Sequence, residues 1–214
     1  MEAQMILSLE QMEGLAAACA PSVAVETLLS VAKVESGFNP LAIGVNGKPA
    51  ITVRAKSKGE AIARASGLIK AGRSVDLGVA QINSRNLQWL GLSVEAAFDP
   101  CRNLAASARV LQDGYGRGAQ RRGGEQHALL TALSYYNTGH PERGFRNGYV
   151  AKVTSAAQRI VPALRPEGVA PAETPTALEA AEAPPPTWDV FGLASEPPSF
   201  VIRVSAPVRK GGPE

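Results

Sequence analysis

The sequence has no hydrophobic run of the roughly 18 residues that a membrane-spanning helix needs, so we predict no stable membrane span. Its first residues, Met-Glu-Ala-Gln, also lack the basic start and the apolar run of a secretory signal peptide. If the protein acts outside the cytoplasm, we therefore expect either that a leader has been removed or that export uses another route.

Cysteine and histidine are scarce, with two residues of each. Cys19 and Cys101 lie in no Cys-x-x-Cys or histidine-rich context, and we assign no chemistry to His127 or His140. We therefore expect no metal and no cofactor. The cysteines leave two possibilities open: one long-range disulfide, which would indicate an oxidising compartment such as a periplasm, or two buried free thiols.

Charge of one sign is also not in large excess, because 22 Lys and Arg residues against 19 Asp and Glu residues give a formal net charge of +3. This excess is too small and too dispersed for a nucleic-acid footprint, so we expect no nucleic-acid partner. The notable basic cluster, Arg117, Arg121 and Arg122, lies among glycines and favours a solvated loop.

The composition changes abruptly after Leu164. Residues 165–187 are mostly Ala, Pro and Glu, and prolines disfavour helix and strand while little apolar surface remains to offset the entropy of ordering. We predict a domain at 1–164 and a flexible, disordered tail at 165–214. A more apolar stretch at 188–204 leaves three possibilities open: docking on a partner, docking on the domain, or a disordered end.

Hydrophobic periodicity within residues 1–164 predicts a mainly helical α+β fold. The apolar segments LAIGV and PAITVR, on either side of Asn46-Gly47, predict a small β-hairpin whose second strand lies at an edge because of Pro49. The helical patterns cover residues 25–35, 57–71, 84–90, 99–115, 129–136 and 149–160.

Glu35 extends the apolar stripe of the 25–32 helical pattern by three residues, which would point its side chain inward. Removal from water and the negative end of the helix dipole would both raise its pKa, and an acid still protonated near neutral pH can donate a proton. The alternative is that residues 36–40 simply end the helix and Glu35 reaches solvent.

Three segments stand out once Glu35 is considered: VESGFNP at 34–40, DLGVAQIN at 76–83 and ALSYYNTG at 132–139. Together, in this order, they resemble the lytic transglycosylases of the lysozyme superfamily. In that family a catalytic Glu-Ser pair ends a helix, a Gly-x-x-Gln-Ile motif lines the cleft, and a Tyr-Asn pair closes the site.

The resemblance is closer to the VirB-type transglycosylases that accompany bacterial type IV secretion systems. It rests on Cys-Ala-Pro at 19–21, the Asn-Gly hairpin, Asp-Pro-Cys-Arg-Asn-Leu at 99–104 and YVAKV at 149–153, and it covers about residues 5–162. It implies a lysozyme-like fold, a disulfide between Cys19 and Cys101, and a periplasmic location.

The resemblance also implies the chemistry. Glu35 would protonate the glycosidic oxygen between N-acetylmuramic acid and N-acetylglucosamine, and would then take the proton of the muramyl 6-hydroxyl, so that a 1,6-anhydro sugar forms. The residues expected to bind substrate or to orient the acid are Ser36, Asp76, Gln81, Asn83, Tyr136, Asn137 and Tyr149.

Asp76 has two possible roles. Hydrolysis by a lysozyme-type enzyme normally needs a second carboxylate, and Asp76 could supply it. A transglycosylase can dispense with that group because the acetamido group of its substrate stabilises the charge at the anomeric carbon, and Asp76 would then brace the turn of the cleft.

The sequence thus predicts an enzyme that opens peptidoglycan locally for a type IV secretion system, with glycan strands and secretion subunits as partners. The tail is a candidate contact for those subunits. Two alternatives stay open: an assembly or scaffold protein with a glycan-binding cleft and little catalysis, or a hydrolase of the same substrate.

Overall fold

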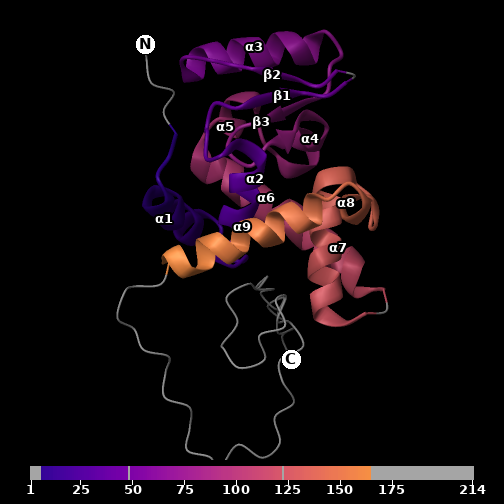
Figure 1. Cartoon of the computed structure of the whole chain (residues 1–214). Helices are drawn as coiled ribbons and strands as arrows, with labels where there is room; N and C mark the ends of the chain where they lie inside the picture. Colours follow the sequence, from indigo (N-terminus) through magenta and orange to yellow (C-terminus); the bar gives the residue numbers. More distant parts are fainter. Residues whose placement is uncertain (1–5, 48, 122, 165–214) are drawn as a thin grey trace, which may run out of the picture.

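The computed structural model describes residues 6–47, 49–121 and 123–164 (Figure 1). The tail predicted at 165–214 and its apolar stretch lie outside the described residues. In chain order the elements are α1 (Leu9–Cys19), α2 (Val25–Ser36), β1 (Ile43–Val45), β2 (Ile51–Val53), α3 (Lys58–Lys70), β3 (Val75–Leu77), β4 (Ile82–Asn83), the 3₁₀ turn η1 (Ser84–Asn86), α4 (Leu87–Leu90), α5 (Val94–Ala97), α6 (Pro100–Ala119), α7 (Gly124–Thr138), α8 (Arg143–Arg146) and α9 (Tyr149–Leu164).

The predicted fold class, mainly helical with a small β element, is confirmed. All six helical patterns are present, although the pattern at 84–90 forms a 3₁₀ turn followed by the short α4. The sequence analysis missed α1, α5 and α8. A signal for α1 was available, because Ser8 and Gln11 form a reciprocal capping box at its start. Among the described residues, no helix is both long and apolar enough to span a membrane.

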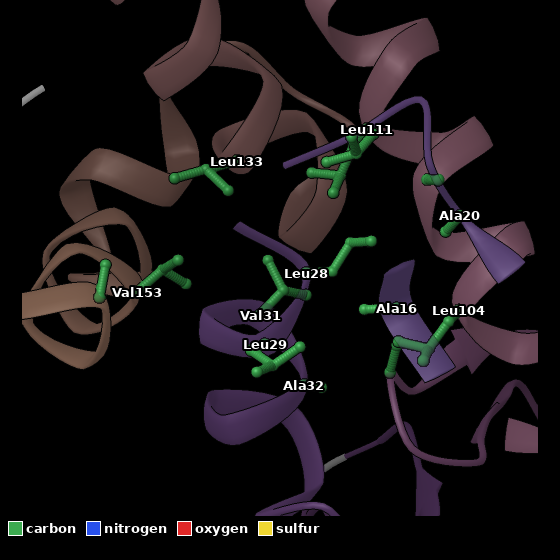
Figure 2. Close-up of a cluster of buried hydrophobic side chains, with 14 of the residues drawn as sticks. Ala16, Ala20, Leu28, Leu29, Val31, Ala32, Leu104, Leu111, Leu133 and Val153 are labelled. Carbon is green, nitrogen blue, oxygen red and sulfur yellow. The ribbon is translucent and has the colours of Figure 1, made fainter. Parts of the chain in front are cut away.

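Helix α2 lies at the centre of the larger core and ends where the sequence predicts. Gly37 adopts a left-handed conformation (φ 64°) and its N–H donates to the Lys33 carbonyl, which ends the helix. Figure 2 shows the side chains of Leu28, Leu29 and Val31 pointing into a cluster with residues of α1, α6, α7 and α9. This surrounding packing fixes the end of α2, where Glu35 lies.

The β element is larger than the predicted hairpin. Four antiparallel strands form a sheet in the order β2-β1-β3-β4, and β2 is an edge strand, as Pro49 predicts. The predicted hairpin around Asn46-Gly47 is present, with β1 and β2 antiparallel and Val45 paired to Ile51 across the connection. Strands β3 and β4 come from the DLGVAQIN segment, which the sequence analysis treated only as a cleft motif.

The sheet has its own core against α3 and α5, centred on residues such as Ile43, Leu77 and Phe98. In Figure 1 the sheet and α3 lie at one end of the molecule, above the helices α2, α6 and α9. The segment that joins β3 to β4 packs against the helical core through Val79 and Ala80. The three sequence motifs therefore meet where the sheet joins the helices.

A disulfide between Cys19 and Cys101 joins the end of α1 to the first turn of α6, with 5.3 Å between the two Cα atoms. This is the pairing that the family resemblance implies. Helix α6 begins at the predicted Asp99-Pro100 pair, where the Asp99 side chain accepts the N–H of Arg102 at 2.9 Å.

We expect replacement of both cysteines by serine to lower the free energy of unfolding by about 2 to 5 kcal/mol, because the bond closes a long loop in the unfolded chain. Denaturant unfolding of the oxidised parent and of the double variant measures the difference. Coincident unfolding transitions would show that the disulfide does not stabilise the fold.

Candidate active site

Glu35, at the end of α2, lines a cleft of about 530 Å³ between the sheet and helices α6 and α7. The lining brings together most of the residues that the sequence analysis singled out, with Ser36 and Tyr149 lying behind it. The predicted residues in the lining are Glu35, Asp76, Gln81, Asn83, Tyr136 and Asn137.

The carboxyl of Glu35 is withdrawn from water. Burial raises its pKa from the usual 4.5 to about 7; the Tyr149 hydroxyl, which donates to Oε1 at 2.5 Å, lowers it, and the negative charge of Asp76 raises it further. Near neutral pH this acid is therefore protonated in a large fraction of molecules. The alternative in which Glu35 reaches freely into solvent does not fit this geometry.

Tyr149 is the first residue of α9 and is 6% exposed. Burial and the charge of Glu35 raise the pKa of its phenol well above 10, so the hydroxyl keeps its proton at any physiological pH. It therefore donates to Glu35 throughout the working range. This donation stabilises the carboxylate that forms when Glu35 gives up its proton.

Asp76 is a braced carboxylate on β3. Its Oδ1 accepts from Asn83 Nδ2 at 2.6 Å and its Oδ2 accepts from Asn46 Nδ2 at 2.8 Å. Burial raises the pKa of Asp76, while these two amides act in the opposite direction. The sequence analysis missed Asn46, which it had assigned to the hairpin turn.

The backbone that joins β3 to β4 is held by a buried asparagine of α6. Asn103 Nδ2 donates to the carbonyls of Leu77 (2.8 Å) and Ala97 (2.7 Å), and its Oδ1 accepts the N–H of Ala80 (2.8 Å). Gly78 is required here, since a Cβ would lie 2.2 Å from the Ala97 carbonyl oxygen and φ is +74°. The sequence analysis did not find Asn103, because nothing in its motif distinguishes it from a surface residue.

Gln81 ends this connection in an unusual backbone conformation, with φ of +52°. Its Nε2 donates to the carbonyls of Ala42 (3.1 Å) and Gly78 (2.9 Å). Both protons of the amide are thereby used, so the oxygen of Gln81 is the group presented to the cleft.

Ser36 and Tyr136 hold the same connection from the helical side. The Ser36 hydroxyl donates to the Val79 carbonyl at 2.6 Å, and the Tyr136 hydroxyl donates to the Ala80 carbonyl at 2.6 Å. Burial and the charge of Glu35 raise the pKa of Tyr136, so it remains a donor. Neither hydroxyl donates to Glu35, so of the two roles expected for these residues, binding substrate or orienting the acid, the second is not made by a direct hydrogen bond.

The cleft continues into a second chamber of about 270 Å³, with which it shares residues such as Asn86 and Tyr135. The chamber adds Trp89, whose side chain is 46% exposed. The Arg109 guanidinium lies 5.7 Å from the Trp89 ring, and its Nη1 donates to the Leu90 carbonyl at 2.6 Å. An aromatic face is therefore fixed beside the acid-bearing cleft.

Among residues 6–47, 49–121 and 123–164, no three His, Cys, Asp or Glu side chains are grouped so that they could hold a metal ion. A buried acid, its phenol partner and a set of oriented amides are what this cleft offers, and such a set suits proton transfer to a neutral polyhydroxylated substrate.

The chain belongs to the Transglycosylase SLT domain family, which it matches over residues 14–157. It is thus a lytic transglycosylase, a class of enzymes that cleave peptidoglycan.

The relatives of this chain indicate which lytic transglycosylases it is similar to. The protein virB1 of Agrobacterium fabrum (strain C58 / ATCC 33970) is 40% identical over 186 residues, which cover 87% of this chain and 72% of that protein. The protein virB1 of Rhizobium radiobacter is 42% identical over 186 residues, or 87% and 74% of the two chains. The type IV secretion system protein virB1 of Brucella suis biovar 1 (strain 1330) is 40% identical over 182 residues, or 79% and 73%. No solved structure matches the chain significantly.

We expect Asn103→Ala to lower the free energy of unfolding by about 3 kcal/mol or more, because it removes three hydrogen bonds between a buried side chain and the backbone. Denaturant unfolding measures the loss, and Arg102→Ala, an exposed neighbour on α6, is the control. Equal stability of the two variants would contradict the bracing role.

We expect Tyr149→Phe to raise the pKa of Glu35, because the carboxylate loses its hydroxyl donor. The protonated acid then persists to higher pH, and the alkaline limb of the activity profile moves upward. Tyr115→Phe is the control, since among the described residues the hydroxyl of Tyr115, on α6, makes no hydrogen bond. A limb that stays in place or moves downward would be inconsistent with this hydrogen bond.

Proposed function

We propose that this protein cleaves the β-1,4 bond between N-acetylmuramic acid and N-acetylglucosamine in peptidoglycan and releases a 1,6-anhydro muramyl end. The observation that carries the proposal is the buried Glu35 carboxyl, protonated near neutral pH, in a cleft lined by amide side chains. Membership of the Transglycosylase SLT domain family supports the same reaction.

One carboxyl group completes the proton balance of this reaction. Glu35 gives its proton to the glycosidic oxygen as the bond from that oxygen to the anomeric carbon breaks. The resulting carboxylate takes the proton of the muramyl 6-hydroxyl as its oxygen bonds to the anomeric carbon, so no water is consumed. The pKa of about 7 favours this exchange, because both protonation states are accessible near neutral pH.

Asp76 then acts as a brace and an electrostatic neighbour of Glu35. Both of its oxygens accept from amides, and it holds Asn46 and Asn83 in the cleft wall. We assign stabilisation of the developing positive charge at the anomeric carbon to the acetamido group of the substrate. The charge of Asp76 also helps keep Glu35 protonated until the glycan arrives.

The polar groups available to the glycan include the oxygen of Gln81 and the amide of Asn137, both in the cleft wall. They suit the N–H and carbonyl of N-acetyl groups and the hydroxyls of sugars. The second chamber, with the exposed ring of Trp89, would receive a further sugar ring of the same strand against its apolar face.

The biological role that we propose for this enzyme is supported by the names of its relatives. Proteins called virB1, four of which are described as type IV secretion system proteins, are about 40% identical to this chain over most of its length. We place this enzyme in the periplasm, where it would open glycan strands locally for assembly of such a system. Its secretion-subunit partners would bind outside the cleft, with residues 165–214 as the candidate contact.

We expect Glu35→Gln to abolish release of anhydro-muropeptides from purified peptidoglycan, because glutamine cannot donate the required proton. Glu26→Gln, on the first turn of the same helix and outside the cleft, is the control and should retain the parent activity.

Mass spectrometry of the released muropeptides separates the alternatives. Absence of release by both the parent and Glu35→Gln would favour a scaffold with a glycan-binding cleft and little catalysis, whereas equal release by both would contradict the catalytic role of Glu35. Parent products heavier by one water, with reducing muramyl ends, would instead identify a hydrolase.

A further inference from the structure

We infer that Asn147 is a positioning residue that fixes both the orientation of the Asn137 amide in the cleft and the place of the Tyr149 hydroxyl beside Glu35. The inference rests on the proposed function, since it concerns how the cleft positions the glycan relative to the catalytic acid. No motif in the sequence indicates Asn147, which lies in a surface turn and is exposed.

Asn147 is held at the junction of two helices. It follows the last residue of α8, and its backbone N–H donates to the Arg143 carbonyl at 3.0 Å. Gly148, with φ of +78°, turns the chain so that α9 begins at Tyr149. The asparagine side chain is therefore anchored at its base and can reach both α7 and α9.

The hydrogen bonds of Asn147 determine which way both amides face. Its Oδ1 accepts the backbone N–H of Tyr149 at 3.0 Å, and only an oxygen can accept there. Its Nδ2 therefore points toward α7, where it donates to Asn137 Oδ1 at 2.8 Å. This bond turns the oxygen of Asn137 toward Asn147, so the NH₂ group of Asn137 is the end that faces away and can donate to a carbonyl of the substrate.

The same side chain fixes the start of α9. The N–H groups of the first helical turn have no partner within the helix, and Asn147 satisfies that of Tyr149. The phenol of this residue then extends to Glu35, where its hydroxyl is 2.5 Å from Oε1. A single asparagine thus connects a substrate-facing amide to the donor that stabilises the catalytic carboxylate.

Three ionisable groups from three elements face Glu35: Asp76 on β3, Tyr136 on α7 and Tyr149 on α9. Of these, Tyr149 is the one that donates a hydrogen bond to the carboxylate. If α9 loses its anchor and the phenol moves, burial and the charge of Asp76 are left unopposed, so the acid keeps its proton to higher pH.

The experiment separates the two functions of Asn147 with two substitutions in the full chain. Asn147→Ala removes both hydrogen bonds. Asn147→Ser keeps an oxygen that can accept the Tyr149 N–H but is too short to reach Asn137. Steady-state kinetics with a soluble tetrasaccharide of alternating N-acetylglucosamine and N-acetylmuramic acid, measured from pH 5 to pH 9, gives kcat and KM for each.

We expect both variants to raise KM by about 3- to 10-fold, the loss of one oriented hydrogen bond. In Asn147→Ala the alkaline limb of kcat also moves to higher pH, whereas in Asn147→Ser it stays with the parent. Asn137→Ala should raise KM alone, and adding Asn147→Ser to it should raise KM no further, because the two residues act through one contact.

Ser93→Ala is the matched structural control, because it removes one hydrogen bond that a helix-start N–H, that of Ala96, donates to a side chain, and neither residue lines the cleft. It should change neither KM nor the pH limb. If the parent is active but both Asn147 variants keep the parent KM and pH limb, or if Asn147 and Asn137 act additively on KM, the inference is wrong. A parent that releases no anhydro product would overturn the proposed function and the inference with it.

Discussion

The desolvation of the Glu35 carboxyl is the constraint on which the rest of the active site depends. Burial is the largest cause of its raised pKa, and it follows from the packing of α2 into the middle of the larger core. A carboxyl with a pKa raised from 4.5 to about 7 makes the folded state progressively less stable as pH rises through that interval. The fold therefore tolerates a local loss of stability for the sake of a proton that can be donated near neutral pH.

The described residues around Glu35 fix the backbone beside it and place no cation against its carboxyl. Ser36 and Tyr136 donate to the backbone that joins β3 to β4, and Asn103 holds that backbone from the other side. No cation pairs with Glu35 in the part of the chain that the structure describes, and the carboxyl meets a phenol and a second carboxylate instead. An ion pair there would have lowered the pKa and removed the acid.

Much of this arrangement follows from local patterns in the sequence. The stripe that ends at Glu35, the stop at Gly37 and the Asp99-Pro100 helix start each depend on neighbours within a few residues, and the structure contains all three. Strands β1 and β2 are equally short but have the Asn46-Gly47 signal between them, whereas β3 and β4 were missed because they are specified by their pairing partners rather than by a local pattern.

The roles of individual hydroxyls and amides were harder to predict from the sequence, because they depend on partners distant in sequence. Ser36 bonds to a carbonyl 43 residues away and Tyr136 to one 56 residues away, so no spacing rule assigns them.

Titration of the Glu35 side-chain carboxyl by NMR in the full chain, assigned with Glu35→Gln, tests the account most directly. The account predicts a pKa of about 7, whereas a value near 4.5 would contradict it.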